Sequence, residues 1–337
     1  MRLYAFLLEM SKTIVDKLTI GLFRSRVVLD GGKFTFCFVP VPAGYSQSQT
    51  HPSILYFPNK WHGYTHILAT TPYPKANIRY ENPCLYYASG KESPTIFVPN
   101  SNNPIIPPPP ENDAYNSDPC LFFENDRLYL LNRRCERTPG IREIEVCYSD
   151  DGQTFSKPST IIVDRADNKE LLSPSIIQYA NTKRIYFLNV YGGFGKHGKC
   201  KGIDIYEGTS FEKANFAHVK TGQFLNREET GIEPWHFDLF EFENKLYMVL
   251  CGRNKRQKGI RHLMTYLAVS EDYQNFRIYD APLVKLLRTY RPTAYLDEKN
   301  NLQLYFSVVG KVAKDKSDRA IALTTFNFQR LLKKYFQ

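Results

Sequence analysis

A short pattern recurs five times along the chain: a polar residue, a proline and then a run of apolar residues. The copies begin at His51-Pro52, Asp118-Pro119, Ser173-Pro174, Glu233-Pro234 and Arg291-Pro292. Successive prolines are 67, 55, 60 and 58 residues apart. A motif that returns at such a regular interval is typical of a repeated supersecondary unit. The pattern therefore predicts five copies of one unit.

Each copy continues with further apolar segments that have the character of β-strands. The second segments, which are rich in Leu, Ile and aromatic residues, are 66–70, 127–132, 184–189, 245–250 and 302–307. The third segments, which follow a variable polar loop, are 83–89, 143–149, 202–208, 264–270 and 320–326. Several third segments lead into a polar turn and an aromatic residue such as Phe155, where we expect a fourth, outer strand to start.

Four antiparallel strands repeated five times predict an all-β fold, the five-bladed β-propeller. We assign residues 36–337 to the propeller, as one domain, and residues 1–35 to an N-terminal extension. In that extension the alternating residues 19–30 could supply an edge strand that closes the ring, and residues 5–17 could form a helix. Residues 98–113 are too rich in proline for the interior of a sheet and are predicted to connect the first two blades.

The composition agrees with a folded globule. Of 337 residues, 42% are hydrophobic and 14% aromatic, which excludes a disordered chain and favours strands over a helical bundle. No stretch reaches the roughly 18 apolar residues of a membrane span. The apolar opening segment is interrupted by Glu9 and Lys12 and has no small-residue cleavage site after it, so we predict no signal peptide and synthesis in the cytoplasm.

Cysteine and histidine show no spacing typical of a bound metal. The seven cysteines are scattered and never form a CxxC pair, and the seven histidines show no HExxH motif. We therefore predict free thiols and assign no metal ligands and no cofactor; a calcium or other ion on the propeller axis is conceivable, but no ligand spacing in the sequence supports it. The sequence does not indicate an oligomeric state.

Innermost strands run close to the axis of a propeller, so polar residues at their starts are predicted to converge. Cleavage of a glycosidic bond needs two carboxyl groups, one protonated and one ionised, or a base that replaces one of them. The residues proposed for catalysis on this ground are Asp118, Glu233, Asp238 and His51. The residues proposed for substrate binding in the same region are Glu81, Glu170, Trp235, His236 and Arg291. For each of them a purely structural role, such as turn formation or core packing for Trp235, is the alternative.

Positive charge is concentrated in the loops between second and third strands. Residues 70–82, 132–143, 190–202, 252–262 and 309–319 carry a formal charge of +13, against +10 for the whole chain. These loops are expected on the face where chain enters the innermost strands, and a basic ring there would attract an anionic ligand. The basic residues proposed to contact substrate are Arg133, Arg134, Lys196, Arg253 and Arg256.

The five-blade count, the proline-anchored strands and the Ser-Asp-Pro at residues 117–119 resemble the propellers of glycoside hydrolase families 43, 62, 32 and 68. Residues 51–90 also resemble the first blade of propellers from bacterial polysaccharide loci and phages. The resemblance implies a family 43 base, supporting Asp and acid at the starts of blades one, two and three. This chain has His51, Asp118 and Ser173 there, so only the supporting Asp is matched.

Three functions follow from these observations. The first is a glycosidase or transglycosylase that acts on an acidic polysaccharide, such as a capsule, through axial carboxylates inside a basic-rimmed funnel. The second is a non-catalytic propeller that binds glycans as an adhesin or receptor-binding protein, which the missing family 43 acid and base favour. The third is a binder of nucleic acid or another polyphosphate, ranked last because the chain contains no nucleic-acid recognition module. Whether the protein is an enzyme stays open at this stage.

Overall fold

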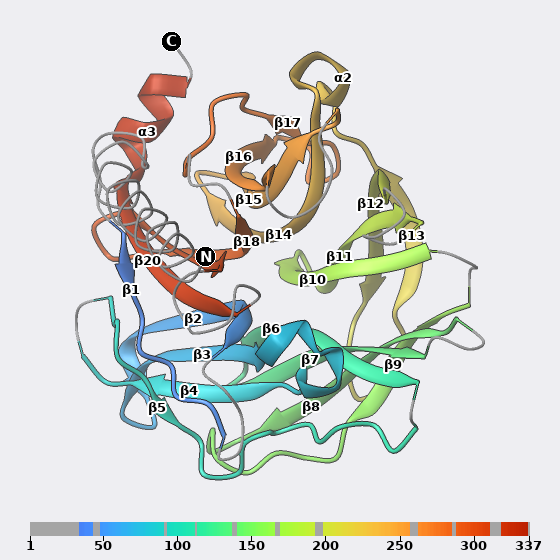
Figure 1. The fold of residues 1–337 in the computed structure, drawn as a ribbon, viewed down its shortest axis with the longest axis vertical. Coiled ribbons are helices and arrows are strands. Elements are labelled where there is room, and N and C mark those ends of the chain that lie inside the picture. The colour runs from blue at the N-terminus through green and yellow to red at the C-terminus, as the bar shows by residue number, and fades with distance from the viewer. Residues whose placement is uncertain are drawn as a thin grey trace, which may run out of the picture.

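The computed structural model describes residues 34–42, 48–90, 93–111, 113–136, 140–165, 169–192, 198–256, 262–284, 288–310 and 318–335. Its strands form five sheets of four antiparallel strands each. The sheets are arranged in a closed ring around a central axis (Figure 1). The prediction of an all-β, five-bladed propeller is confirmed. The predicted helix at 5–17 and edge strand at 19–30 lie outside the described residues.

The first three strands of every blade follow one another outward from the axis. The innermost strands are β2 (Gln49–Trp61), β6 (Ala114–Glu124), β10 (Lys169–Tyr179), β14 (Ile232–Phe242) and β18 (Thr289–Leu296). The second strands are β3 (Tyr64–Pro72), β7 (Arg127–Glu136), β11 (Thr182–Tyr191), β15 (Lys245–Asn254) and β19 (Asn301–Val309). The third strands are β4 (Cys84–Ala88), β8 (Arg142–Ser149), β12 (Lys199–Gly208), β16 (Met264–Ser270) and β20 (Arg319–Asn327).

The outer strands differ in length and, in one blade, in origin. They are β5 (Val98–Pro99), β9 (Ser159–Asp164), β13 (Ala217–Gly222), β17 (Arg277–Ile278) and β1 (Thr35–Phe36). The first four follow the third strand of their own blade, but β1 precedes every other strand and pairs with β20 of blade five. In Figure 1 the blue β1 lies beside the red β20. Blade five is thus closed by a strand from the other end of the described chain.

Tight turns set the register of the first and second strands. Asn125 and Asp126 join β6 to β7 with φ of 51° and 60°, and Glu243 and Asn244 join β14 to β15 with φ of 48° and 56°. Two consecutive residues with positive φ form a turn whose twist matches that of the flanking strands. These turns lie at the end of the innermost strand opposite to the repeated proline. The strand pairing that they fix therefore continues along the strand up to the bulge at the proline.

Buried apolar side chains fill the space between neighbouring sheets. Leu188, Phe237 and Met248 are fully buried in the cluster between blades three and four. Burial of a side chain of this size contributes about 1.5–3 kcal/mol. This packing fixes the angle between sheets and therefore the position of each innermost strand at the axis.

Four short helices complete the described fold. They are η2 (Pro74–Ala76), η3 (Ile78–Tyr80), α2 (Arg227–Thr230) and α3 (Phe328–Tyr335). The helix α3 buries Phe328 and Leu331 in the cluster shared by blades four and five. No helix among the described residues has both the length and the apolar character needed to cross a membrane.

Candidate functional site

All five innermost strands interrupt their pairing with the second strand near the repeated proline. The interruptions fall between Thr50 and Ser53, Ser117 and Cys120, Leu172 and Ser175, Pro234 and His236, and Tyr290 and Pro292. A bulge of this kind leaves residues outside the ladder and redirects their side chains. In four blades the bulge leaves the polar residue before the proline outside the ladder, whereas in blade four it leaves Trp235.

The bulges of the first three blades share an uncommon backbone conformation. His51, Asp118 and Ser173, each the residue before the proline, have φ of 53°, 50° and 55°. A residue with a Cβ atom in this region costs about 1–3 kcal/mol and persists only where the surrounding structure enforces it. The same costly geometry in three blades points to a role beyond connecting strands.

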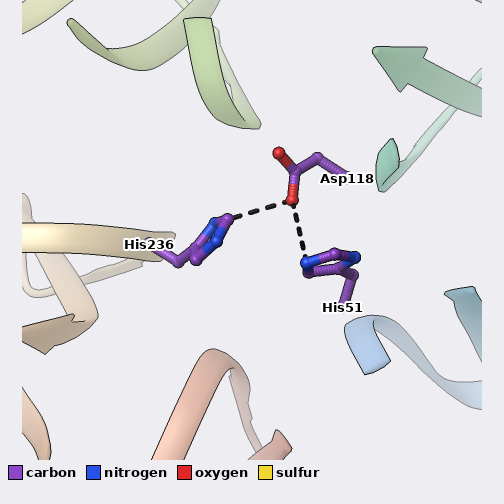
Figure 2. Close-up of side chains that lie close together, drawn as sticks. All are labelled: His51, Asp118 and His236. Carbon is purple, nitrogen blue, oxygen red and sulfur yellow. Dashed lines mark ion pairs between the residues drawn. The ribbon is translucent and has the colours of Figure 1, made fainter. Parts of the chain in front are cut away.

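Asp118 is the centre of the cluster that forms there. Its Oδ1 atom lies 3.6 Å from Nε2 of His51, 3.5 Å from Nδ1 of His236 and 3.0 Å from Nη1 of Arg291. Its Oδ2 atom lies 3.1 Å from Nε of Arg133. Figure 2 shows His51 and His236 approaching Asp118 from two sides, each from its own blade. The exposed fractions of Asp118, His51 and His236 are 0, 2 and 2%.

The environment fixes the protonation of these three groups at neutral pH. Burial would raise the pKa of Asp118, but His236, His51 and the guanidinium groups of Arg133 and Arg291 together lower it far below its usual value. Burial lowers the pKa of His51 well below its usual value and that of His236 to about 3, although Asp118 opposes both shifts. The cluster therefore contains one carboxylate and two neutral imidazoles.

Blades three and five hold this cluster in place. The hydroxyl of Ser173 lies 2.6 Å from Nδ1 of His236, and its backbone N–H donates to Oδ2 of Asp118 over 3.4 Å. Nη2 of Arg291 donates to the carbonyl of Pro119 over 2.9 Å. All five blades thus supply a residue to the axial centre.

Blade four supplies His236 to this centre, and Glu233 lies elsewhere. Its bulge leaves only Trp235 outside the ladder, so Glu233 remains paired with Arg253 on β15. Oε1 of Glu233 accepts a hydrogen bond from the backbone N–H of Cys200 in blade three. Trp235 packs in the cluster between blades three and four, and its Nε1 donates to the hydroxyl of Tyr290 over 3.3 Å. The structure thus brings His236 to Asp118, but not Glu233 or Trp235.

Asp238 lies in a second layer of the axis, two residues beyond His236. Its Oδ1 accepts from the hydroxyl of Ser175 over 2.7 Å, and its Oδ2 accepts from the hydroxyl of Thr293 over 2.5 Å. Those hydroxyls in turn accept the backbone N–H groups of Leu239 and Ile54. Asp238 therefore links blades three, four, five and one, and both of its oxygens are engaged in doing so.

Glu170 is bound by two arginines. Nη1 of Arg133 lies 2.7 Å from its Oε2, and Arg142 binds both of its oxygens at 2.8 and 2.7 Å. Arg133 thereby bridges Glu170 and Asp118. Arg134, on the opposite side of β7, belongs instead to a network with Glu111, Glu136 and Glu143.

Glu81, which follows the helix η3, is 4% exposed, and its carboxyl group senses the charge of Asp118. Burial raises its pKa to about 8, and the charge of Asp118 adds to the rise, although Arg319 and a hydrogen bond with Ser117 act in the opposite sense. Glu81 is consequently protonated at neutral pH while Asp118 is ionised. The centre contains two carboxyl groups in opposite protonation states.

This protonation state predicts how stability changes with pH. A carboxyl group with a usual pKa of 4.5 that rises to about 8 on folding is stabilising at low pH, and the contribution is lost as pH rises from 4.5 through 8. We expect Glu81→Gln to be more stable than the unmodified protein at pH 8.5 and to show no such gain at pH 4.5, measured by urea denaturation at both pH values.

Glu228 provides the control for this measurement. It is exposed, and a hydrogen bond from Lys255 lowers the pKa of its carboxyl group. Glu228→Gln should therefore give no gain in stability at high pH. A Glu81→Gln protein that behaves like Glu228→Gln at both pH values would contradict the protonated state of Glu81.

The remaining basic residues predicted to contact substrate occupy different environments. Arg253 is buried, with an exposed fraction of 5%, whereas Arg256 is exposed two residues beyond the end of β15. Lys196 lies outside the described residues.

Sequence reasoning missed several residues of the centre. Arg319, at the start of β20, was only one of the charges counted in its loop, yet its guanidinium contacts the rings of Tyr73 and Tyr290. Ser173 stood in the repeated motif without an assigned role, and Arg142 had none. The signal for Ser173 was its place before a repeated proline, whereas Arg319 and Arg142 belong to no motif.

The centre also has the composition of a metal site. One ligand atom each from His51, Asp118 and His236 lie within 4.8 Å of one another. Nε2 of His51 and Nε2 of His236 are buried and have no hydrogen-bond partner among the described residues. Neutral imidazole and ionised carboxylate are the states in which these side chains bind divalent cations. These three side chains could therefore hold one such ion.

Comparison with known proteins supports the propeller fold. No family model matches the sequence. The A type blood N-acetyl-α-D-galactosamine deacetylase of Flavonifractor plautii is 24% identical over 275 residues, which cover 66% of this chain and 35% of the relative. The chain thus spans about a third of the length of that relative.

Solved structures give the same picture. The crystal structure of an N-acetylgalactosamine deacetylase from F. plautii, in complex with blood group B trisaccharide, superposes with a TM-score of 0.72 at 16% identity, covering 92% of this chain and 97% of that one. A family 43 β-xylosidase/α-arabinofuranosidase from a compost metagenome superposes with a TM-score of 0.58 at 12% identity, covering 87 and 94%. The resemblance to family 43 propellers is therefore confirmed for the fold.

Proposed function

We propose that this protein is a glycan hydrolase whose reaction centre is the axial cluster of His51, Asp118 and His236. The observation that carries the proposal is the convergence of two neutral imidazoles and one carboxylate from three blades on one buried point. The strained backbone at His51 and Asp118 supports it, because such strain is concentrated at functional sites.

The reaction that this centre fits best is hydrolysis of an acyl group, with acetyl on an amino sugar as the leading candidate. A divalent cation at the three side chains would polarise the amide carbonyl and activate water near neutral pH. Hydrolysis forms a C–O bond between water and the acetyl carbon, breaks the C–N bond, and leaves acetate and an amine that needs a proton. Glu81, protonated and electrostatically coupled to Asp118, is the group that we assign as its donor. The similarity to the F. plautii deacetylase supports this reaction.

A second candidate is cleavage of a glycosidic bond, the reaction expected from sequence. The observation in its favour is that Glu81 is protonated while Asp118 is ionised, which are the two states that an acid and a base or nucleophile require. The carboxylates first considered for this role, Glu233 and Asp238, are engaged in contacts between blades. In this candidate Asp118 and Glu81 would form the pair, and the substrate would be an acidic polysaccharide such as a capsule.

Metal binding and product analysis test the proposal. We expect protein freed of metal by a chelator to bind one zinc ion per chain in calorimetry, and His236→Gln to weaken that binding at least tenfold. With a panel of N-acetylated oligosaccharides, the zinc-loaded protein should release acetate, measured enzymatically, without new reducing ends.

The exposed His62 provides a matched control, because it lies outside the cluster and contacts the backbone carbonyl of Asp150. His62→Gln should bind zinc and release acetate as the unmodified protein does. Release of reducing ends instead of acetate would favour glycosidic cleavage. Binding of glycans with no product at all would identify a non-catalytic propeller.

A further inference from the structure

Arg319 occupies an aromatic cage beside the axial centre. Its guanidinium carbon lies 4.1 Å from the ring centre of Tyr73 and 4.5 Å from that of Tyr290. The ring of Tyr290 packs in turn on His236 and His51, with ring centres 4.6 and 5.5 Å apart. Contact with two rings restricts the guanidinium group, so it is held in place for a ligand that binds it.

The cage provides Arg319 with little hydrogen bonding. Arg319 is 7% exposed, its Nη1 donates to the hydroxyl of Thr50 over a long 3.4 Å, and its Nε has no partner among the described residues. Burial of a cation without a partner costs several kcal/mol, and the planar guanidinium is suited to binding two oxygens at once.

Arg319 also lacks the counter-charge that the neighbouring arginines have. Arg133 and Arg291 both bind Asp118, and Arg142 binds Glu170. No carboxylate among the described residues lies within ion-pair distance of Arg319, and the carboxyl group of Glu81, which senses its charge, is protonated at neutral pH. The described centre therefore has one guanidinium charge that nothing neutralises.

We propose that Arg319 is a binding subsite for an anionic group of the glycan, a carboxylate or a phosphate, and that the substrate is accordingly an acidic glycan. This inference rests on the proposed function, since it places the anionic group beside the proposed reaction centre. A bound anion would accept hydrogen bonds from Nε and the terminal nitrogens in the plane of the guanidinium group. The anionic ligand would thus provide the negative charge that Arg319 lacks among the described residues.

Three monosaccharides test the subsite without requiring turnover. D-glucuronate supplies a carboxylate, D-glucose 6-phosphate a phosphate, and D-glucose neither, and their binding to the full-length protein is measured by calorimetry. We expect at least one anionic sugar to bind ten or more times more tightly than glucose. Arg319→Gln should abolish that preference, and Arg319→Lys should retain only part of it, because lysine keeps the charge but not the planar fork. The anionic sugar that binds more tightly identifies whether the bound group is a carboxylate or a phosphate.

Arg330 provides the control, because it is exposed on α3. Arg330→Gln removes the same charge and should leave the preference unchanged. Equal affinities for all three sugars, or a preference that survives in Arg319→Gln, would overturn the proposal. If Arg319→Gln fails to fold, the NMR signal of the Arg319 Nε–H group in the unmodified protein decides: it should shift on titration with the anionic sugar and not with glucose.

The outcome is separable from that of the proposed function. A protein that binds glucuronate through Arg319 but releases no product would refute the hydrolase and leave the subsite. A protein that deacetylates acidic oligosaccharides equally well with and without Arg319 would refute the subsite and leave the hydrolase.

Discussion

Asp118→Ala is expected to lower the free energy of unfolding by about 3–5 kcal/mol, the cost of breaking a buried ion pair from one side. Asp118 is fully buried and forms ion pairs with Arg291 on one oxygen and Arg133 on the other, at 3.0 and 3.1 Å. Its removal leaves the guanidinium groups of Arg133 and Arg291 buried without the carboxylate that they share. The same substitution should abolish zinc binding, because Asp118 is the only carboxylate in the three-residue cluster. Urea denaturation followed by tryptophan fluorescence measures the first effect and calorimetry the second.

An exposed ion pair of the same type provides the control. Asp150 binds Arg127 through two hydrogen bonds of 2.6 and 3.1 Å, with the side chain of Asp150 65% exposed. Because water solvates the remaining Arg127 when this exposed pair is broken, Asp150→Ala should cost less than about 1 kcal/mol. Asp118→Asn, which keeps the side-chain volume, separates packing from charge: it should recover part of the stability and none of the zinc affinity. Equal losses for Asp118→Ala and Asp150→Ala would contradict the role of Asp118 as the charge centre.

Asp238→Ala is expected to cost about 3–6 kcal/mol, since hydrogen bonds to a charged group contribute roughly 1.5–3 kcal/mol each and two are lost. The hydroxyl groups of Ser175 and Thr293 lose their acceptor, and both connect neighbouring blades. The expected loss is in stability, measured by urea denaturation, while the activity of the molecules that remain folded is retained.

Ser53 provides the control for this second prediction. It occupies the equivalent place in blade one, where its hydroxyl accepts a single backbone hydrogen bond from Leu121 over 3.0 Å. Ser53→Ala should therefore cost about 1 kcal/mol. A folded Asp238→Asn protein that has lost turnover would return Asp238 to the chemical role first assigned to it from sequence.

The repeat was sufficient to predict the fold, because every blade must bury the same faces and so repeats the same apolar segments. It also predicted that residues before the prolines lie at the axis, which holds for His51, Asp118 and Arg291. It could not predict blade four, where the bulge falls after the proline and leaves Trp235 outside the ladder. Glu233 therefore stays paired with β15, and His236 lies beside Asp118 instead. A bulge depends on hydrogen bonding between two strands, which the residues of one strand do not encode alone.

The metal-like cluster and the Arg319 cage illustrate a different limit. The three potential ligands come from three blades, so no short spacing in the sequence announces them. Arg319 meets Tyr290 within blade five, and it meets Tyr73 through the closure of the ring, which brings blade five against blade one. Motif searches detect ligands that share one helix or loop, whereas an axial centre is assembled by the packing of whole sheets.

The pairing of β1 with β20 has a consequence for biosynthesis. Thr35 and Phe36 pair with Leu323 and Ala322, which are synthesised almost 290 residues later. Arg291 and Arg319 belong to the same late sheet, so His51 and Asp118 are translated long before the arginines that complete their surroundings. A nascent or truncated polypeptide would thus lack a complete axial centre, which forms only once the last blade has been made and has paired with β1.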